Sequence, residues 1–282
     1  MEGVDWIMKI TKKYYSDAML HASATHQAYL RRYLKKQRKI KFWQWTIFIL
    51  FFALWEFSAS THIINPFIFS SPSRVLETML TMAKDGTVFY HIGITLVETF
   101  ASFFLVIIIG ILVAIILWWN RTAAKVLEPY LVILNSLPKS ALAPVFIVWL
   151  GNNVKTIIVA AVSVAVFGSI ITLYTNFVGV EEDKIKLIKT LGGSKKDVLF
   201  KVILPSNVPS IISVMKVNIG LSLVGVIIGE FLAAKAGLGY LIIYGSQVFK
   251  LDWVIMSVVI LCILATFLYK ILNFIERKVQ ER

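Results

Sequence analysis

Six polar or ionisable residues interrupt runs of this chain that are otherwise strongly apolar. They are Glu98, Asn135, Lys139, Asn218, Ser222 and Glu230. In apolar surroundings each such side chain must find a hydrogen-bonding or ionic partner, because leaving it unpaired is costly. That partner is either a bound solute or another side chain. The six residues are therefore the candidates for a solute pathway.

Glu230 stands near the end of one apolar run, where an ionisable residue is a functional candidate by default. The alternatives are a structural ion pair with Lys235 or Lys139, or exposure at an interface. Glu98 shares a helical face with Thr95 and needs a partner of its own.

Asn218 and Ser222 are one helical turn apart. They face either a pathway or a neighbouring helix, to which they would donate hydrogen bonds. Asn135 and Lys139 flank Pro138, a residue that breaks helices. Lys139 either attracts an anion or extends its amine toward the membrane surface.

Other kinds of chemistry are poorly represented. The histidines are scattered, Cys262 is the only cysteine, and no metal-ligand spacing occurs, so we expect no metal site. No GxxxxGK[ST] phosphate loop is present, because Gly192–Lys195 is too short and lacks a preceding strand. We therefore expect no catalytic residues and no cofactor on this chain.

The composition is that of a membrane protein. The 282 residues are 58% hydrophobic and only 16% charged, whereas soluble domains carry about 25% charged residues. Crossing the membrane takes about 20 apolar residues. We predict an all-α, polytopic helical bundle with about six transmembrane helices, over 42–60, 91–119, 128–150, 154–175, 208–233 and 253–272.

Basic residues orient the chain. With both termini in the cytosol, the inner segments hold 22 lysines and arginines and the outer segments hold 5. Such a bias marks the cytosolic side. It accounts for the net charge of +13 without nucleic acid as a partner. Residues 1–41 form a basic cytosolic arm, either lying on anionic lipids or solvated, and 273–282 form a cytosolic tail.

The outer segment 61–90 is expected to contain a short amphipathic helix, because Ser71 and Pro72 form a helix start signal. Gly225 and Gly229 make a GxxxG pattern, which suits either a dimer face or packing within the chain. The core of the helical bundle is then 91–272.

Residues 180–206 form a lysine-rich loop within this core. Apolar residues at helical spacing precede Gly192 and Gly193, and Ser194 with Asp197 makes a capping box for a second helix. Two short amphipathic helices at an angle can enter a groove on a soluble partner. The alternative is that both helices merely rest on the ends of the spans.

This loop resembles the EAA loop of binding-protein-dependent ABC permeases. That pattern places I-x-L-P nine residues after a glycine, as Gly192 and 202–205 do here. SPSRVLETML, HIGITLVETF, LNSLPKSALAPVFIVWLG and GEFLAAKAGLGYLI extend the resemblance over residues 70–277, to the subgroup that transports nitrate, sulfonate, taurine and thiamine precursors. One departure is Lys186-Leu187-Ile188, where the family has Glu-Ala-Ala.

The resemblance implies a type I ABC importer permease in a bacterial inner membrane. Its partners would be a second permease copy, ABC ATPase subunits that carry the ATP and Mg, and an extracytoplasmic solute-binding protein. The solute would be a small anion, or a thiamine or pyrimidine precursor. The resemblance assigns ATPase coupling to Glu181, Glu182, Lys186, Leu191, Gly192, Gly193, Leu204 and Pro205.

Three rival functions remain at this point. A secondary transporter or channel would work without an ATPase. A membrane-embedded enzyme would need a convergent acid–base or metal cluster, and a scaffold would leave the helical hairpin unexplained.

Overall fold

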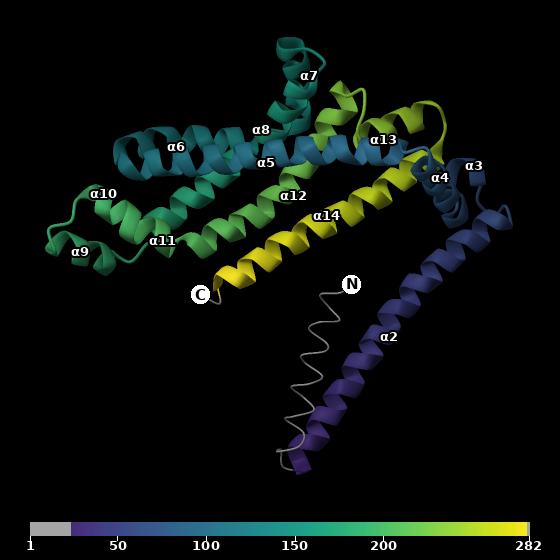
Figure 1. Ribbon diagram of the computed structural model, residues 1–282, viewed down its shortest axis with the longest axis horizontal. Helices are drawn as coiled ribbons and strands as arrows, with labels where there is room; N and C mark the ends of the chain where they lie inside the picture. The colour runs from purple at the N-terminus through teal and green to yellow at the C-terminus, as the bar shows by residue number, and fades with distance from the viewer. Residues whose placement is uncertain (1–23, 281–282) are drawn as a thin grey trace. The chain divides into compact units, whose positions relative to one another are not determined.

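The computed structural model describes residues 24–280, and those residues are mostly helical with no strands (Figure 1). The chain divides into two compact units, Met1–Pro66 and Phe67–Arg282. The first 23 residues of the predicted arm and the last two of the tail lie outside the described residues. The all-α prediction is confirmed.

One long helix, α2 (Ala24–Ser60), makes up most of the described part of the first unit. At 1.5 Å per residue its 37 residues extend about 55 Å, well beyond the thickness of a bilayer core. Its apolar half contains a candidate span, and its basic half continues the same helix. The composition therefore changes near residue 41, but the secondary structure does not. A short helix, α3 (Pro66–Phe69), follows.

Four long helices dominate the second unit: α5 (Thr87–Trp119), α8 (Val154–Val178), α12 (Val208–Ala233) and α14 (Leu251–Gln280). Each is long and apolar enough to cross a membrane, as is the apolar part of α2.

A sixth span is possible from two bent helices. α6 (Arg121–Ser136) and α7 (Lys139–Leu150) meet at 96° across Leu137 and Pro138. Proline disfavours a helical conformation of the residue before it, so a break there is expected. The described residues therefore hold five spans, or six if the bent pair counts as one.

Glycines bring the long helices of the second unit close together. A Cβ at Gly225 would lie 2.6 Å from Cα of Ala161, and one at Gly229 would lie 2.9 Å from Cα of Ile157. Both contacts join α12 to α8, so the GxxxG pattern serves packing within the chain. On α5, a Cβ at Gly110 would lie 2.8 Å from Oγ of Ser169.

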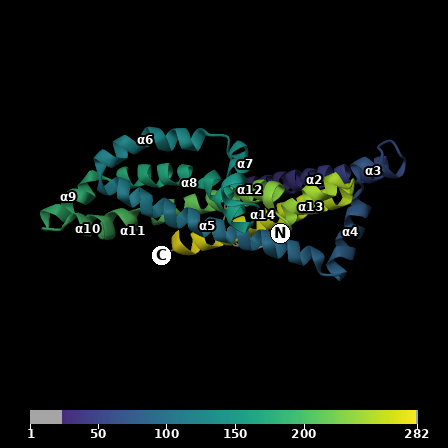
Figure 2. The ribbon, with the colours of Figure 1, turned by 90° about the horizontal axis from the view of Figure 1, so that it is seen from above.

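The two ends of this unit differ (Figures 1 and 2). At one end are α9 (Glu182–Thr190), α10 (Lys195–Val198) and α11 (Leu204–Ser206). At the other end, α4 (Pro72–Lys84) and α13 (Leu238–Gln247) pack around Leu238, Leu241 and Met256. Ser71 caps α4 by accepting a hydrogen bond from the Arg74 amide, as the Ser-Pro pair predicts.

Replacing Gly225 by Ala should destabilise the protein by about 1–3 kcal/mol, because the new methyl group overpacks the α12–α8 contact. Gly220 is the matched control, since a Cβ there meets nothing within 4 Å. Gly220→Ala should be neutral or stabilising by up to about 1 kcal/mol. Thermal unfolding of the two purified variants measures the difference, and equal midpoints would contradict the packing.

Candidate functional site

The 180–206 loop is a helical hairpin whose turn is fixed by two glycines. At the end of α9, the Gly193 amide donates to the Ile188 carbonyl at 2.8 Å, and the Gly192 amide donates to the Lys189 carbonyl at 3.0 Å. Gly192 has φ of +80°, a conformation that side chains disfavour. This pair of bonds is the Schellman motif, which ends a helix sharply.

The second helix of the hairpin begins with the predicted capping box. The Ser194 amide donates to Oδ2 of Asp197 at 2.9 Å, and the Asp197 amide donates to Oγ of Ser194 at 3.3 Å. Nζ of Lys201 lies 2.7 Å from Oδ1 of Asp197. The hydrogen bonds from Lys201 and Ser194 hold the pKa of Asp197 well below its usual range. The start of this helix is therefore charged and fixed near neutral pH.

Before the next span the helix widens into a π turn over Leu199–Ile203. Pro205 follows within α11 and has no amide to donate to the carbonyl four residues earlier. In the wide turn, the Leu204 amide instead donates to the Leu199 carbonyl. The turn thus accommodates Pro205 without ending the chain of helices, and the hairpin continues through Asn207 into α12.

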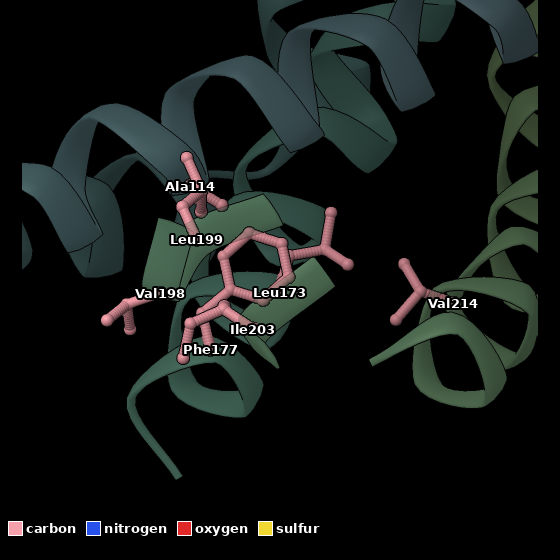
Figure 3. Close-up of a cluster of buried hydrophobic side chains, with 7 residues drawn as sticks. All are labelled: Ala114, Leu173, Phe177, Val198, Leu199, Ile203 and Val214. Carbon is pink, nitrogen blue, oxygen red and sulfur yellow. The ribbon is translucent and has the colours of Figure 1, made fainter. Parts of the chain in front are cut away.

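One face of the hairpin is anchored on the ends of the long helices (Figure 3). Val198, Leu199 and Ile203 are buried in a single cluster with residues of α5, α8 and α12. The cluster partners are Ala114, Leu173, Phe177 and Val214. Ile185, Ile188 and Leu204 pack against the same cluster from outside. The hairpin is therefore rigidly attached at its base.

The opposite face of the hairpin is apolar and exposed. Leu187 is 60% exposed, Leu191 is 76% exposed and Phe200 is 65% exposed. Ile185 and Ile188 rest on the ends of the spans, as the second sequence alternative expects, whereas Leu187, Leu191 and Phe200 are exposed. Insertion of the exposed side chains into a groove of a soluble partner stays a prediction.

Charged residues surround the exposed face. Lys186 pairs with Glu182 at 3.6 Å and with Asp183 at 3.3 Å, and Lys184 pairs with Glu181 at 3.2 Å. Lys186 stands where the family pattern has a glutamate, so the charge at this position is reversed. Acidic neighbours balance the positive charge of Lys186.

A lysine ties the hairpin turn to α5. Nζ of Lys195 donates to the Trp119 carbonyl at 2.5 Å, and the amine lies 5.0 Å from the Trp119 ring centroid. Because α5 ends at Trp119, this contact links the hairpin to the end of a span.

The candidate pathway residues of α12 are satisfied or enclosed within the chain. Nδ2 of Asn218 donates to Oγ of Ser169 at 2.9 Å, and both residues are buried. Ser222 is fully buried, and its hydroxyl has no partner among the described residues. A role for these two residues in a pathway stays a prediction.

Glu230 lies beside Glu98 rather than beside a lysine. Both are at most 2% exposed, and their carboxyl groups are within hydrogen-bonding reach of each other. Oγ1 of Thr95 donates to Oε1 of Glu230 at 2.7 Å. Within the described residues, neither Lys235 nor Lys139 forms a salt bridge with either carboxyl.

Asn135 and Lys139 lie together at the α6–α7 bend. Nζ of Lys139 donates to the carbonyls of Leu134 and Asn135, the latter at 3.2 Å, and lies 5.5 Å from the Phe167 ring centroid. Among the described residues, no carboxylate comes within ion-pairing distance of this amine.

The contacts of His91 and Gly239 were absent from the sequence-based predictions. His91 accepts a hydrogen bond from the Gly237 amide at 2.9 Å, and the Gly239 amide donates to Glu230 at 2.5 Å. Both positions occur in stretches that resemble the permeases, HIGITLVETF and GEFLAAKAGLGYLI, and that resemblance was the available signal.

Solved structures similar to this chain are ABC transporters. A chain of the MetNI methionine ABC transporter, in an inward-facing conformation, matches with a TM-score of 0.60 and 20% identity. The match covers 68% of this chain and 96% of that one. It supports the type I importer permease fold.

Sequence relatives are transport permeases. The formylaminopyrimidine transport permease ThiX of Halalkalibacterium halodurans is 27% identical, over 68% of this chain and 76% of ThiX. The taurine transport permease TauC of Escherichia coli is 25% identical, over 80% of this chain and 84% of TauC. A family model matches residues 106–281, more than half the chain. The chain therefore belongs to the family of binding-protein-dependent transport system inner membrane components.

Proposed function

We propose that this permease lines the solute pathway of an ABC importer as a homodimer and is driven by separate ATPase subunits. The observation that carries the proposal is the two-faced hairpin. Its base is buried on α5, α8 and α12, whereas Leu187, Leu191 and Phe200 are exposed. A rigid, apolar projection suits insertion into a groove of a soluble protein. An extracytoplasmic binding protein delivers the solute on the opposite side.

In this proposal the hairpin, both termini and the basic half of α2 are cytosolic, as the distribution of lysine and arginine favours. The basic half of α2 then lies next to the inner leaflet, where anionic lipids attract positive charge. ATP-driven closure of the ATPases moves the hairpin, and the attached helices rock between two orientations.

The docking contact is apolar at its centre and charged at its rim. The acidic residues Glu181, Glu182 and Asp183 take the place of the family glutamate, since Lys186 is already paired with two of them. Gly192 and Gly193 fix the angle of the hairpin, and Leu204 and Pro205 join it to α12.

Replacing Leu191 by Glu should abolish co-purification with the ATPase subunits. Burying a leucine contributes about 1.5–3 kcal/mol, and a buried, unpaired carboxylate costs more. Because Leu191 is 76% exposed, the permease alone should keep its thermal stability. Leu191→Met is the matched control, since it keeps an apolar side chain of similar volume. If wild-type protein moves solute with no ATPase attached, it is a secondary transporter or channel.

Replacing Gly192 by Pro should stop uptake while leaving the protein in the membrane. Proline holds φ near −65°, so it cannot adopt the +80° found here, and it removes the amide that bonds to Lys189. Such backbone strain costs about 1–3 kcal/mol. Gly192→Asn is the control, because asparagine tolerates this conformation. Uptake into cells, normalised to membrane-inserted protein, is the measurement. Unchanged uptake by Gly192→Pro would refute the role of Gly192 in fixing the hairpin angle.

The solute is a small anion, such as a sulfonate, taurine or nitrate, or else a thiamine or pyrimidine precursor. The names of ThiX and TauC represent both classes. Lys139 favours the anion, since its half-buried amine has no acidic partner among the described residues. In the proposed pathway it lies with Asn135 at the α6–α7 bend, and Glu98, Asn218, Ser222 and Glu230 lie deeper within the helices.

Replacing Lys139 by Gln should weaken transport of an anionic solute by about tenfold or more, because a hydrogen bond to a charged group contributes about 1.5–3 kcal/mol. Lys139→Arg should retain most of the activity. Uptake of an alkanesulfonate, which carries a net negative charge, and of a neutral aminopyrimidine into proteoliposomes, each with its binding protein, separates the two solute classes. An equal loss in both variants would point to packing rather than charge.

A further inference from the structure

The N-terminus of α13 lies inside the second unit. Its first amides have no partner within the helix and cannot reach water there, so other side chains must accept their hydrogen bonds. Among the first amides, Gly237 donates to Nδ1 of His91, and Leu238 donates to Oγ1 of Thr95 at 2.9 Å. Gly239 donates to Oε2 of Glu230. Side chains of α5 and α12 thus satisfy donors that a helix start leaves open.

This arrangement requires glycine at the two positions nearest the carboxyl. A Cβ at Gly237 would overlap the Glu230 carboxyl, and one at Gly239 would lie 2.8 Å from Oε2 of Glu230. The chain therefore turns tightly around Glu230, and the carboxyl occupies the place of an N-terminal cap.

The hydrogen-bond donors around Glu230 favour its ionised form. The Gly239 amide and the Thr95 hydroxyl both donate to it. An ionised carboxylate only accepts hydrogen bonds, so it matches such a set of donors, and the helix start supplies partial positive charge.

Glu98 has the opposite surroundings. It is 2% exposed, and its Oε2 has no hydrogen-bond partner among the described residues. The polar group beside it is the carboxyl of Glu230. Two adjoining carboxylates cannot both be ionised without a nearby cation, and none pairs with them in the described part of the chain. An unpaired oxygen is tolerable on a neutral acid and costly on an anion.

We propose that Glu98 and Glu230 share one proton, with Glu98 as the neutral donor and Glu230 as the anion that caps α13. Glu98 and Thr95 are then positioning residues, since they hold the carboxylate where the α13 amides meet it. The pair fixes α13 to α5 and α12, so these three elements move as one body.

Infrared spectroscopy of the purified full-length protein in lipid nanodiscs tests the proton directly. At neutral pH the wild-type protein should show the carbonyl band of a protonated carboxylic acid. Glu98→Gln should remove this band, and the exposed-site control Glu77→Gln should retain it. Absence of the band in the wild-type protein, or its persistence in Glu98→Gln, would overturn the proposal. This readout does not depend on transport, so it is independent of the proposed function.

Hydrogen exchange of the amides at 237–240 tests the cap. Glu98→Gln should change their exchange rates by less than about threefold, because the amide N–H replaces the acid as donor to Glu230. Glu230→Gln should accelerate exchange by about tenfold or more, since a neutral amide cannot match the same donors. Equal acceleration in both variants, or the reverse order, would contradict the assignment. If Glu230→Gln does not fold, the infrared result still decides whether the pair holds a proton.

Discussion

Pairing of backbone polar groups in the absence of water is the constraint on which the rest of this structure depends. A continuous helix satisfies its own amides and carbonyls, so spans need no special side chains. Each break in a helix releases groups that something else must satisfy. In this chain polar side chains of the spans are found where helices break.

Three breaks illustrate the rule. At the α6–α7 bend, Lys139 donates to two carbonyls at the end of α6. At the start of α12, Nδ2 of the buried Asn207 donates to the Ile203 carbonyl at 2.8 Å. At the start of α13, Thr95 and Glu230 accept from backbone amides. A polar residue within a span is therefore not by itself evidence of a pathway.

Local signals in the sequence were sufficient to predict the hairpin and the spans. Gly192, Ser194 and Asp197 act within a few residues of one another, so turn and capping rules predict them. Hydropathy likewise predicts long helices, and Pro138 predicts the bend. The contact of Thr95 with Glu230 joins residues 135 positions apart, and no periodic pattern contains that information. The same limit applies to the two faces of α9, where packing rather than spacing decides that Ile188 is covered and Leu187 exposed.

The departure of this hairpin from its family also has a physical explanation. A glutamate at the position of Lys186 would offer a partner a charge, but exposed ion pairs contribute little, about 0–1 kcal/mol. Here the charge is reversed and then balanced by Glu182 and Asp183, so the net electrostatic change at the surface is small. The exposed area of Leu187 and Leu191 is unaffected by that exchange. Since apolar burial contributes more than a solvated ion pair, a hairpin of this shape can keep its apolar contact surface while the charge of the residue at position 186 changes sign.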